Sequence, residues 1–529
     1  MRTNLPISAT RVRSSVLWLA VVLGLGVLLG GAAAQPVWGQ SPGRERALEL
    51  LNKRYADRYA EYAAEMEQLA KYCEEQSYFS DAEEIRQRAR PVSEGTMDID
   101  DLPETLLPEI PRTLPPTELQ WRTKLRKIET DYANELFRIA RDALSQGHVS
   151  LAFALVRETA FHNPDHAPSR EMLGYVRDGE EWTTAFARMM KKKNYVDDPT
   201  FGWIDRKLLP RYLAGERELN GQWVSAEREA AIRSDFRYAW QIQTEHFEVR
   251  TNHSREKGVE IARQLEEFHA FFLREFTAFF NSREQLQRLF TGRPGGRNVN
   301  HRYYVYYFRN KEEFVRALRP RQPNIDQING LYMPADRIAY FYFDEKSGDE
   351  TLETVFHEVT HQLLGESRNR MFDVGEKSDF WVIEGLACYL ESYDLPPRGE
   401  HVGHPRHLRI YWARRKAIDE GFYVPMREFT GLGKQQFQQP GNYETLQAYY
   451  NQAAGVVHFF LNYQDGIYQD AFIEYLSQVY HPSDRVRNNP DTLEDLTGIR
   501  FETLDQQYLE HLESLPAGLP VGRVGENRE

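Results

Sequence analysis

Two histidines four residues apart, with a glutamate directly after the first, constrain the fold of this chain more than any other feature. They are His357, Glu358 and His361 in the segment TVFHEVTHQLLGES, residues 354–367. Residues that favour helix ends flank the segment: Ser347, Gly348, Asp349 and Gly365. On a helix with about 3.6 residues per turn, His357 and His361 project from one face, whereas Glu358 points about 100 degrees away. The sequence therefore predicts a helix with two imidazoles on one face.

A second segment offers a third ligand. SDFWVIEGLACYLES, residues 378–392, carries Glu384 23 positions after His361 and is expected to form a helix capped by Ser378 or Asp379. Small residues follow the glutamate and would let the two helices approach closely: Gly385 and Ala387. Catalytic zinc has three protein ligands and an open position for water.

Chance has to be weighed, because with 15 histidines a chain of this size shows H-E-x-x-H accidentally on the order of a few times in a hundred. The alternative is two ordinary histidines on a helix. The third ligand favours a site for one zinc ion (Zn2+) per chain, made by His357, His361 and Glu384.

These residues carry a family resemblance. HEVTH followed by WVIEGLACYLE resembles the gluzincin metallopeptidases, the clan of thermolysin and the aminopeptidases, and especially its peptidase-MA-like bacterial members. The resemblance covers roughly residues 235–510 and is strongest at 330–395. It implies zinc held by the three ligands, Glu358 as general base, and a substrate-lining edge strand within GLYMPADRIAYFYF, residues 330–343. Glu358 would take a proton from a zinc-activated water that attacks a peptide carbonyl.

The resemblance also implies a tyrosine that stabilises the oxyanion. In gluzincin aminopeptidases this tyrosine begins a later helix, and YYNQAAGVVHFFL is similar to that segment, which gives the role to Tyr450. Tyr449 is the alternative if the alignment shifts by one residue. A tyrosine that only packs in the core is the other interpretation.

Other residues near the motifs are less specific. Cys388 stands where thermolysin-like proteins have an aspartate that orients a histidine ligand, and Glu391 either replaces it or is a solvated glutamate. The loop HVGHPRH contains His401, His404 and His407, which we interpret as scattered loop histidines rather than a second metal site. A further histidine, His458, is expected on a helix face.

The fold class is predicted to be α+β and predominantly helical. Alternating apolar and polar positions predict a strand at 244–252, the aromatic segment HRYYVYYF predicts one at 301–308, and DRIAYFYF at 336–343 is expected to be another. Between the first two, GVEIARQLEEFHAFFLREFTAFF has helical spacing. We therefore expect a small mixed sheet crossed by a helix, followed by a helical half. Together they would form a gluzincin-like metallopeptidase domain over residues 235–512, with a flexible tail at 513–529.

Helical regions are expected before this domain. Residues 35–92 are rich in good helix formers, and 93–116 contain five prolines, which is typical of a linker. Residues 117–234 are predicted to be helical, with a tetratricopeptide-like hairpin. This region either binds a protein partner or supports the packing of the domain that follows, and the second interpretation is favoured because stable arrays need three or more repeats.

The N-terminal residues 1–34 have the pattern of a signal peptide. Three arginines precede the apolar run VLWLAVVLGLGVLLGG, and Ala32 to Ala34 provide small residues for cleavage. The sequence therefore predicts export to the periplasm, the cell envelope or the extracellular space. An uncleaved segment that anchors the chain in a membrane is the alternative.

Charge and cysteine content exclude some functions. The net charge of -13 and pI near 5.7 argue against nucleic acid as the main partner. With two cysteines, Cys73 and Cys388, a disulfide framework is excluded and buried free thiols are expected.

The favoured function is an exported zinc metallopeptidase that acts on a peptide or protein substrate. Two alternatives remain open at this point. One is a catalytically inactive gluzincin-fold protein that binds a partner in the cell envelope. The other is a zinc hydrolase of a non-peptide amide or ester.

Overall fold

The computed structural model describes residues 42–91, 99, 101–292, 302–345, 350–368, 373–394 and 402–520, apart from the side chains of 42–45, 350 and 351. Several predicted features lie outside these residues. They are the signal segment 1–34, the helix-capping residues Ser347 to Asp349, His401, and the end of the tail from residue 521. In the part of the chain that is described, no helix combines the length and the apolar character needed to cross a bilayer.

Long helices form the first described region, as predicted. Their bounds are α1 Pro42–Glu75, α2 Phe79–Arg88, α3 Pro116–Ser145, α4 Val149–His162 and α5 Ala167–Met172. Helices α3 and α4 make a hairpin whose turn contains Gly147 at φ 93, a backbone conformation that favours glycine. A buried apolar cluster from Leu51 to Val156 joins these helices. The likeness of the hairpin to a tetratricopeptide unit stays a prediction.

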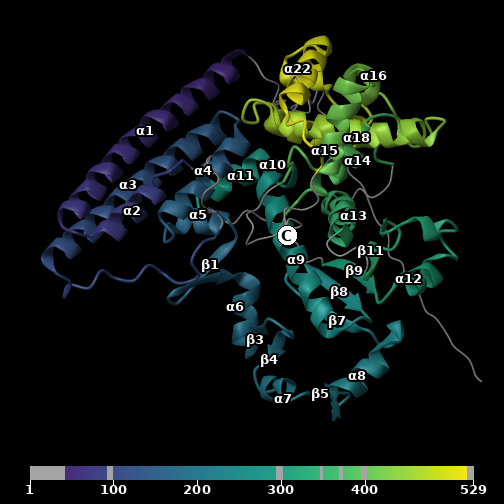
Figure 1. The fold of residues 1–529 in the computed structure, drawn as a ribbon, viewed down its shortest axis with the longest axis horizontal. Helices are drawn as coiled ribbons and strands as arrows, with labels where there is room; N and C mark the ends of the chain where they lie inside the picture. The colour runs from purple at the N-terminus through teal and green to yellow at the C-terminus, as the bar shows by residue number, and fades with distance from the viewer. Residues whose placement is uncertain are drawn as a thin grey trace, which may run out of the picture. The chain divides into compact units, whose positions relative to one another are not determined.

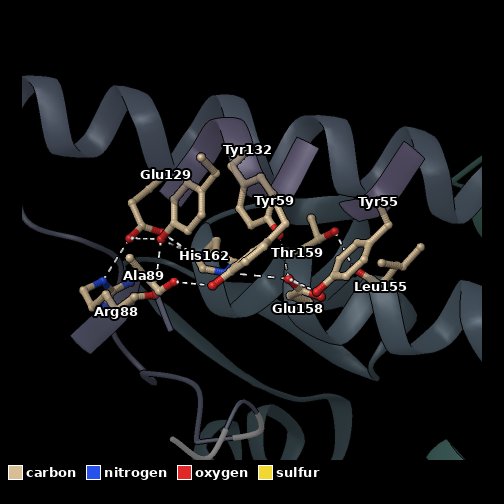
Figure 2. Close-up of polar contacts among 11 residues, drawn as sticks. Tyr55, Tyr59, Arg88, Ala89, Glu129, Tyr132, Leu155, Glu158, Thr159 and His162 are labelled. Carbon is tan, nitrogen blue, oxygen red and sulfur yellow. Dashed lines mark hydrogen bonds and ion pairs between the residues drawn. The ribbon is translucent and has the colours of Figure 1, made fainter. Parts of the chain in front are cut away.

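A buried polar network crosses this helical region (Figure 2). Glu129 accepts hydrogen bonds from His162 Nδ1 at 2.7 Å and from Arg88 Nε at 3.0 Å. One turn before His162, Glu158 accepts a hydrogen bond from the Tyr132 hydroxyl at 3.0 Å. Burial raises the pKa of Glu158, whereas His162 and Arg88 overcome the effect of burial and lower the pKa of Glu129. The network gives hydrogen-bond partners to the buried carboxylates of Glu129 and Glu158.

Three β-hairpins, each followed by a helix, occupy residues 175–233. The strands are β1 Tyr175–Asp178 with β2 Glu181–Thr184, β3 Tyr195–Asp198 with β4 Gly202–Asp205, and β5 Glu216–Leu219 with β6 Gln222–Ser225. The helices are α6 Ala185–Lys192, α7 Leu209–Leu213 and α8 Ala226–Arg233. Each hairpin has a tryptophan at the second position of its second strand, and these are Trp182, Trp203 and Trp223. The expectation of a helical region through residue 234 is therefore wrong from residue 175 onward.

A small mixed sheet follows, as the sequence predicts, and it has five strands where the sequence patterns indicated three. Its strands are β7 Trp240–Gln243, β8 Phe247–Thr251, β9 Tyr303–Phe308, β10 Leu331–Met333 and β11 Ile338–Tyr342. Their order is β10-β11-β9-β8-β7, with the two inner pairs parallel and both outer pairs antiparallel. Strand β10 therefore lies at an edge of the sheet.

The longest helices that pack beside this sheet are α9 Arg255–Glu275 and α13 Glu350–Ser367 (Figure 1). Gly258 of α9 allows a close approach, because a Cβ there would lie 2.9 Å from side-chain atoms of both Ile242 and Thr251. Helix α13 continues to Ser367, two residues beyond the expected stop at Gly365. The shorter elements nearby are η2 Phe236–Tyr238, α10 Thr277–Phe280, α11 Arg283–Phe290, α12 Lys311–Leu318 and η3 Ile325–Gln327.

The C-terminal half is helical. Its elements are α14 Phe380–Leu390, α15 Leu408–Arg414, the π-helix Arg415–Asp419, α16 Met426–Thr430, α17 Lys434–Gln438, α18 Tyr443–Asn462, α19 Gln469–Val479, α20 Asp484–Arg487, α21 Leu493–Thr497 and α22 Phe501–Ser514. The α+β class with a predominance of helix is confirmed. Both cysteines are buried free thiols, as expected.

Gly385 of α14 serves a different contact from the one expected. A Cβ at this position would lie 2.7 Å from the backbone oxygen of Ala453 in α18. The glycine therefore allows the close approach of α18 rather than of α13. Helix α14, which carries Glu384, packs against both of these helices.

Candidate metal centre

The two histidines of α13 face each other. Their Nε2 atoms lie 3.2 Å apart, and the rings are nearly perpendicular with an interplanar angle of 81°. Both side chains are partly exposed. The one-turn spacing predicted from the sequence thus brings two imidazole nitrogens to one point.

Glu384 of α14 completes the group. Its Oε2 lies 3.5 Å from His357 Nε2 and 3.7 Å from His361 Nε2. Ligands bound tetrahedrally at about 2.0–2.2 Å from zinc would be separated by roughly 3.3–3.6 Å. The three observed separations bracket this range, so the residues fit a tetrahedral zinc ion. Burial would raise the pKa of Glu384, but His361 and His357 lower it, so the carboxylate is ionised as a metal ligand requires.

A carboxylate and an arginine hold His357 from behind. His357 Nδ1 donates to Glu391 Oε1 at 2.8 Å, and Arg409 binds both oxygens of Glu391 at 2.7 and 3.0 Å. Burial would raise the pKa of Glu391, but Arg409 and His357 lower it to about 2. Of the two interpretations of Glu391, the contact to the histidine is the one observed. Cys388 Sγ lies 4.0 Å from the same Nδ1 and is buried.

Arg409 was not recognised in the sequence. It lies 18 residues after Glu391, beyond residues 395–401, on the short helix α15. No local pattern links it to the motif, although an arginine near a candidate carboxylate could have been searched for. Its bidentate contact leaves the Nδ1 proton of His357 with a fixed acceptor and turns Nε2 toward His361 and Glu384.

Glu358 points toward the edge strand of the sheet. Its Oε2 accepts a hydrogen bond from the backbone N–H of Tyr332 in β10 at 2.7 Å. The Tyr332 hydroxyl in turn donates to Glu366 at 3.2 Å, and Arg337 donates to the same carboxylate at 3.0 Å. Strand β10 is therefore tied to α13 at two points, beside the group of His357.

Tyr450 lies in the second turn of α18, whereas the resemblance expects a tyrosine at the helix start. Burial raises its pKa, and the nearby charge of Glu384 raises it further. Its ring packs against Phe437, with centroids 5.3 Å apart, and the adjacent Tyr449 contacts the same phenylalanine.

Tyr480 is a second tyrosine whose pKa is raised by burial and by the charge of Glu384, and it was not predicted from the sequence. It follows α19 directly, 96 positions after the glutamate, and its surroundings show only apolar helical spacing. The sequence offers no feature that distinguishes it from a core tyrosine.

The other predicted histidines do not join a metal-capable group. Of the residues that are described, His404, His407 and His458 belong to no set of three such ligands. His407 is buried, with Nε2 3.8 Å from Glu353. His458 is a buried residue of α18: its Nε2 donates to the oxygen of Gly403 at 3.0 Å, and its Nδ1 is 2.9 Å from Nε2 of His511 in α22.

A large cavity lies away from this group. Its volume is about 650 Å³, and the residues that line it include none of His357, Glu358, His361 or Glu384. The candidate centre is thus defined by its ligand geometry rather than by this cavity. Comparison with protein-family models and with curated protein sequences finds no match to this chain.

Proposed function

We propose that the chain is an exported, zinc-dependent metallopeptidase of the gluzincin type. The observation that carries the proposal is the spacing of 3.2–3.7 Å among His357 Nε2, His361 Nε2 and Glu384 Oε2. Two imidazoles and one carboxylate form a ligand set typical of catalytic zinc with an open position. Export rests on the N-terminal sequence pattern alone.

Each residue near the ligands has a role in this proposal. Bound there, zinc would act as a Lewis acid that polarises a substrate carbonyl and activates a water molecule. Glu358 accepts the proton of the attacking water and returns it to the leaving amine. Tyr450 donates a hydrogen bond to the oxyanion of the substrate. Glu391 and Arg409 keep His357 oriented.

The edge strand supports a peptide as the substrate. Extended peptides bind to the free edge of a sheet through main-chain hydrogen bonds. Strand β10 is such an edge, and the backbone of Tyr332 meets Glu358. A peptide laid along β10 would therefore pass the carboxylate that accepts the proton.

Two other functions remain as alternatives. An inactive protein with a structural metal would have no need for a glutamate directly after His357, so the presence of Glu358 in the motif favours an enzyme. A zinc hydrolase of a non-peptide amide or ester would use the same ligands. The edge strand favours the peptidase among these, because a small amide does not need a main-chain docking site.

A screen of a defined peptide mixture separates the three functions. The secreted, mature protein is incubated with the mixture before and after removal of metal with a chelator, and again after zinc is restored. The proposal expects peptide cleavage that is lost on chelation and recovered with zinc. Metal binding without cleavage would favour the inactive protein, and hydrolysis of ester or amide probes alone would favour the third function.

A further inference from the structure

The cavity of about 650 Å³ carries a second group of metal-capable side chains. Its walls are formed by α9, by the turn between β7 and β8, and by parts of the first two hairpins and of α4. The apolar part of the wall includes Phe153, Met172, Trp203, Val259, Leu273 and Leu289. His246, Glu266 and His269 line the same cavity. Their ligand atoms all lie within 4.8 Å of one another.

The backbone places these three residues together by two simple features. Glu266 and His269 are three positions apart on α9, so they share one face of the helix. An E-x-x-H spacing of this kind supplies metal ligands in helical di-iron proteins. His246 comes from the tight turn that joins β7 to β8, which packs on the same helix.

Glu266 is already oriented. Its Oε1 accepts the backbone N–H of His246 at 2.6 Å, and its Oε2 accepts from His246 Nδ1 at 2.7 Å. Burial would raise the pKa of Glu266, but the hydrogen bonds from His246 lower it, so the carboxylate is ionised. The backbone contact fixes one oxygen and leaves the other directed at the two imidazoles.

His269 lies against His246. Their rings are stacked with centroids 4.0 Å apart and an angle of 29° between the planes, and His269 is only 3% exposed. Two adjacent imidazoles and an ionised carboxylate are the donor set preferred by zinc and its neighbours in the first transition series.

We infer that His246, Glu266 and His269 form a second site for a divalent transition-metal ion, separate from the group of His357. The ion would take the place of the proton that His246 Nδ1 shares with Glu266, and that proton would pass to solvent. The 2.7 Å separation of these atoms would open by about 0.6 Å to reach the roughly 3.3 Å between tetrahedral ligands, and His269 would turn its ring out of the stack. The remaining coordination positions would face the cavity and accept water or a small ligand.

Metal counting on the full mature chain tests this inference. Zn2+ and Co2+ are bound by equilibrium dialysis and counted by elemental analysis, and Co2+ also reports its ligands by visible absorption. We expect two ions in the wild type and one in the variant His357→Ala/His361→Ala. Adding Glu266→Gln to that variant should remove the second ion. Glu260→Gln, an exposed change on the same helix, should leave it in place.

The outcomes distinguish the two sites. If His357→Ala/His361→Ala binds no ion, or if Glu266→Gln in that background retains one, the second site is wrong. An ion that persists in the double histidine variant and is lost with Glu266→Gln supports the second site even if the first group binds nothing. If Glu266→Gln does not fold in this background, His246→Gln replaces it as the variant that removes a ligand of the second site. A circular dichroism spectrum checks the folding of each variant.

Discussion

At the scale of single residues, the contact between Arg409 and Glu391 sets the orientation of the His357 imidazole. The guanidinium binds both carboxylate oxygens, and Glu391 then accepts the Nδ1 proton of His357. Without the arginine, a buried carboxylate would have only the histidine as its partner. The imidazole would then be freer to rotate away from His361.

Arg409→Gln is expected to weaken zinc binding by about 10- to 100-fold, which is typical when a partner of a metal ligand is removed. Competition with a chromophoric chelator measures the affinity. Arg409→Lys should recover part of it, since a lysine restores the charge but not the bidentate geometry. The exposed change Arg485→Gln serves as the control, and equal affinities for Arg409→Gln and this control would refute the positioning role.

Substitution of Tyr450 distinguishes a catalytic role of its hydroxyl from a role in packing alone. If its hydroxyl stabilises the oxyanion, Tyr450→Phe should lower turnover by roughly a hundredfold while zinc content and melting temperature stay near the wild-type values. A tyrosine that only packs would instead lose about 1–3 kcal/mol of stability with little change in turnover per folded molecule. Tyr449→Phe is the neighbouring control, and Tyr480→Phe tests the second tyrosine near Glu384. Full activity in Tyr450→Phe would exclude it as the donor.

Some residues of the candidate site could be predicted from the sequence, and others could not. His357, His361 and Glu384 were predicted because helical periodicity fixes the first two and a second short motif supplies the third. Tyr332, Tyr480 and Arg409 come to the group from β10, from the end of α19 and from α15. Their positions depend on long-range packing, which no local pattern in a single sequence reports.

At the scale of elements, helices and strands with a strong period were predicted and short hairpins were not. The helix at 255–275 repeats its apolar residues at helical spacing, and the strand at 303–308 stands out by its run of aromatic residues. Strands β1 to β6 have four residues each, too few for alternation to stand out. One of these turns does have a sequence signal for a hairpin, because an Asn-Gly pair favours a tight turn between strands. The pair is Asn220 and Gly221, and both residues have positive φ in the structure.

The contact between α18 and α22 makes the stability depend on pH. His458 donates from Nε2 to Gly403, so its Nδ1 accepts the proton of His511 Nε2, and the ring of His458 must be neutral. Burial lowers the pKa of His458 to about 3 and that of His511 to about 4. Because these pKa values lie below that of an unfolded histidine, the unfolded state takes up protons first. The stabilisation is present above about pH 6.5 and is lost as the pH falls toward 4.

Urea unfolding at several pH values tests this dependence. Between pH 6.5 and 4 the free energy of unfolding should fall with a slope of up to about 1.4 kcal/mol per pH unit for each of the two groups. His511→Gln keeps a donor toward His458 and removes one titrating group, so its slope should be shallower. A variant slope equal to that of the wild type would show that His511 does not titrate in this way.

At the scale of the whole molecule, the elements that carry the proposed catalytic residues share one continuous apolar core. That core runs from Trp240 to Leu512 and includes residues of the sheet, of α13 and of α14. The sequence-based boundary at residue 235 was drawn from a change in period, from helical spacing to strand alternation. The three hairpins before residue 235 were not predicted. Each is followed by a helix, whose spacing obscures the alternation of apolar and polar residues in the short strands.

The N-terminal pattern predicts removal of residues 1–34 during export. Sequencing the N-terminus of the protein made in an exporting host should find a mature chain that begins near Gln35. A positive n-region followed by an apolar run and small residues is the physical basis of this expectation. A chain that retains Met1 would favour the anchored alternative.

The central claim is tested most directly by Glu358→Gln, with zinc content and peptide hydrolysis measured on the same sample. Glutamine has nearly the shape of glutamate but does not accept the proton of the attacking water. We predict zinc content equal to that of the wild type and loss of chelator-sensitive hydrolysis, while the exposed control Glu312→Gln retains both. Hydrolysis by Glu358→Gln at the wild-type rate, with full zinc content, would contradict the account.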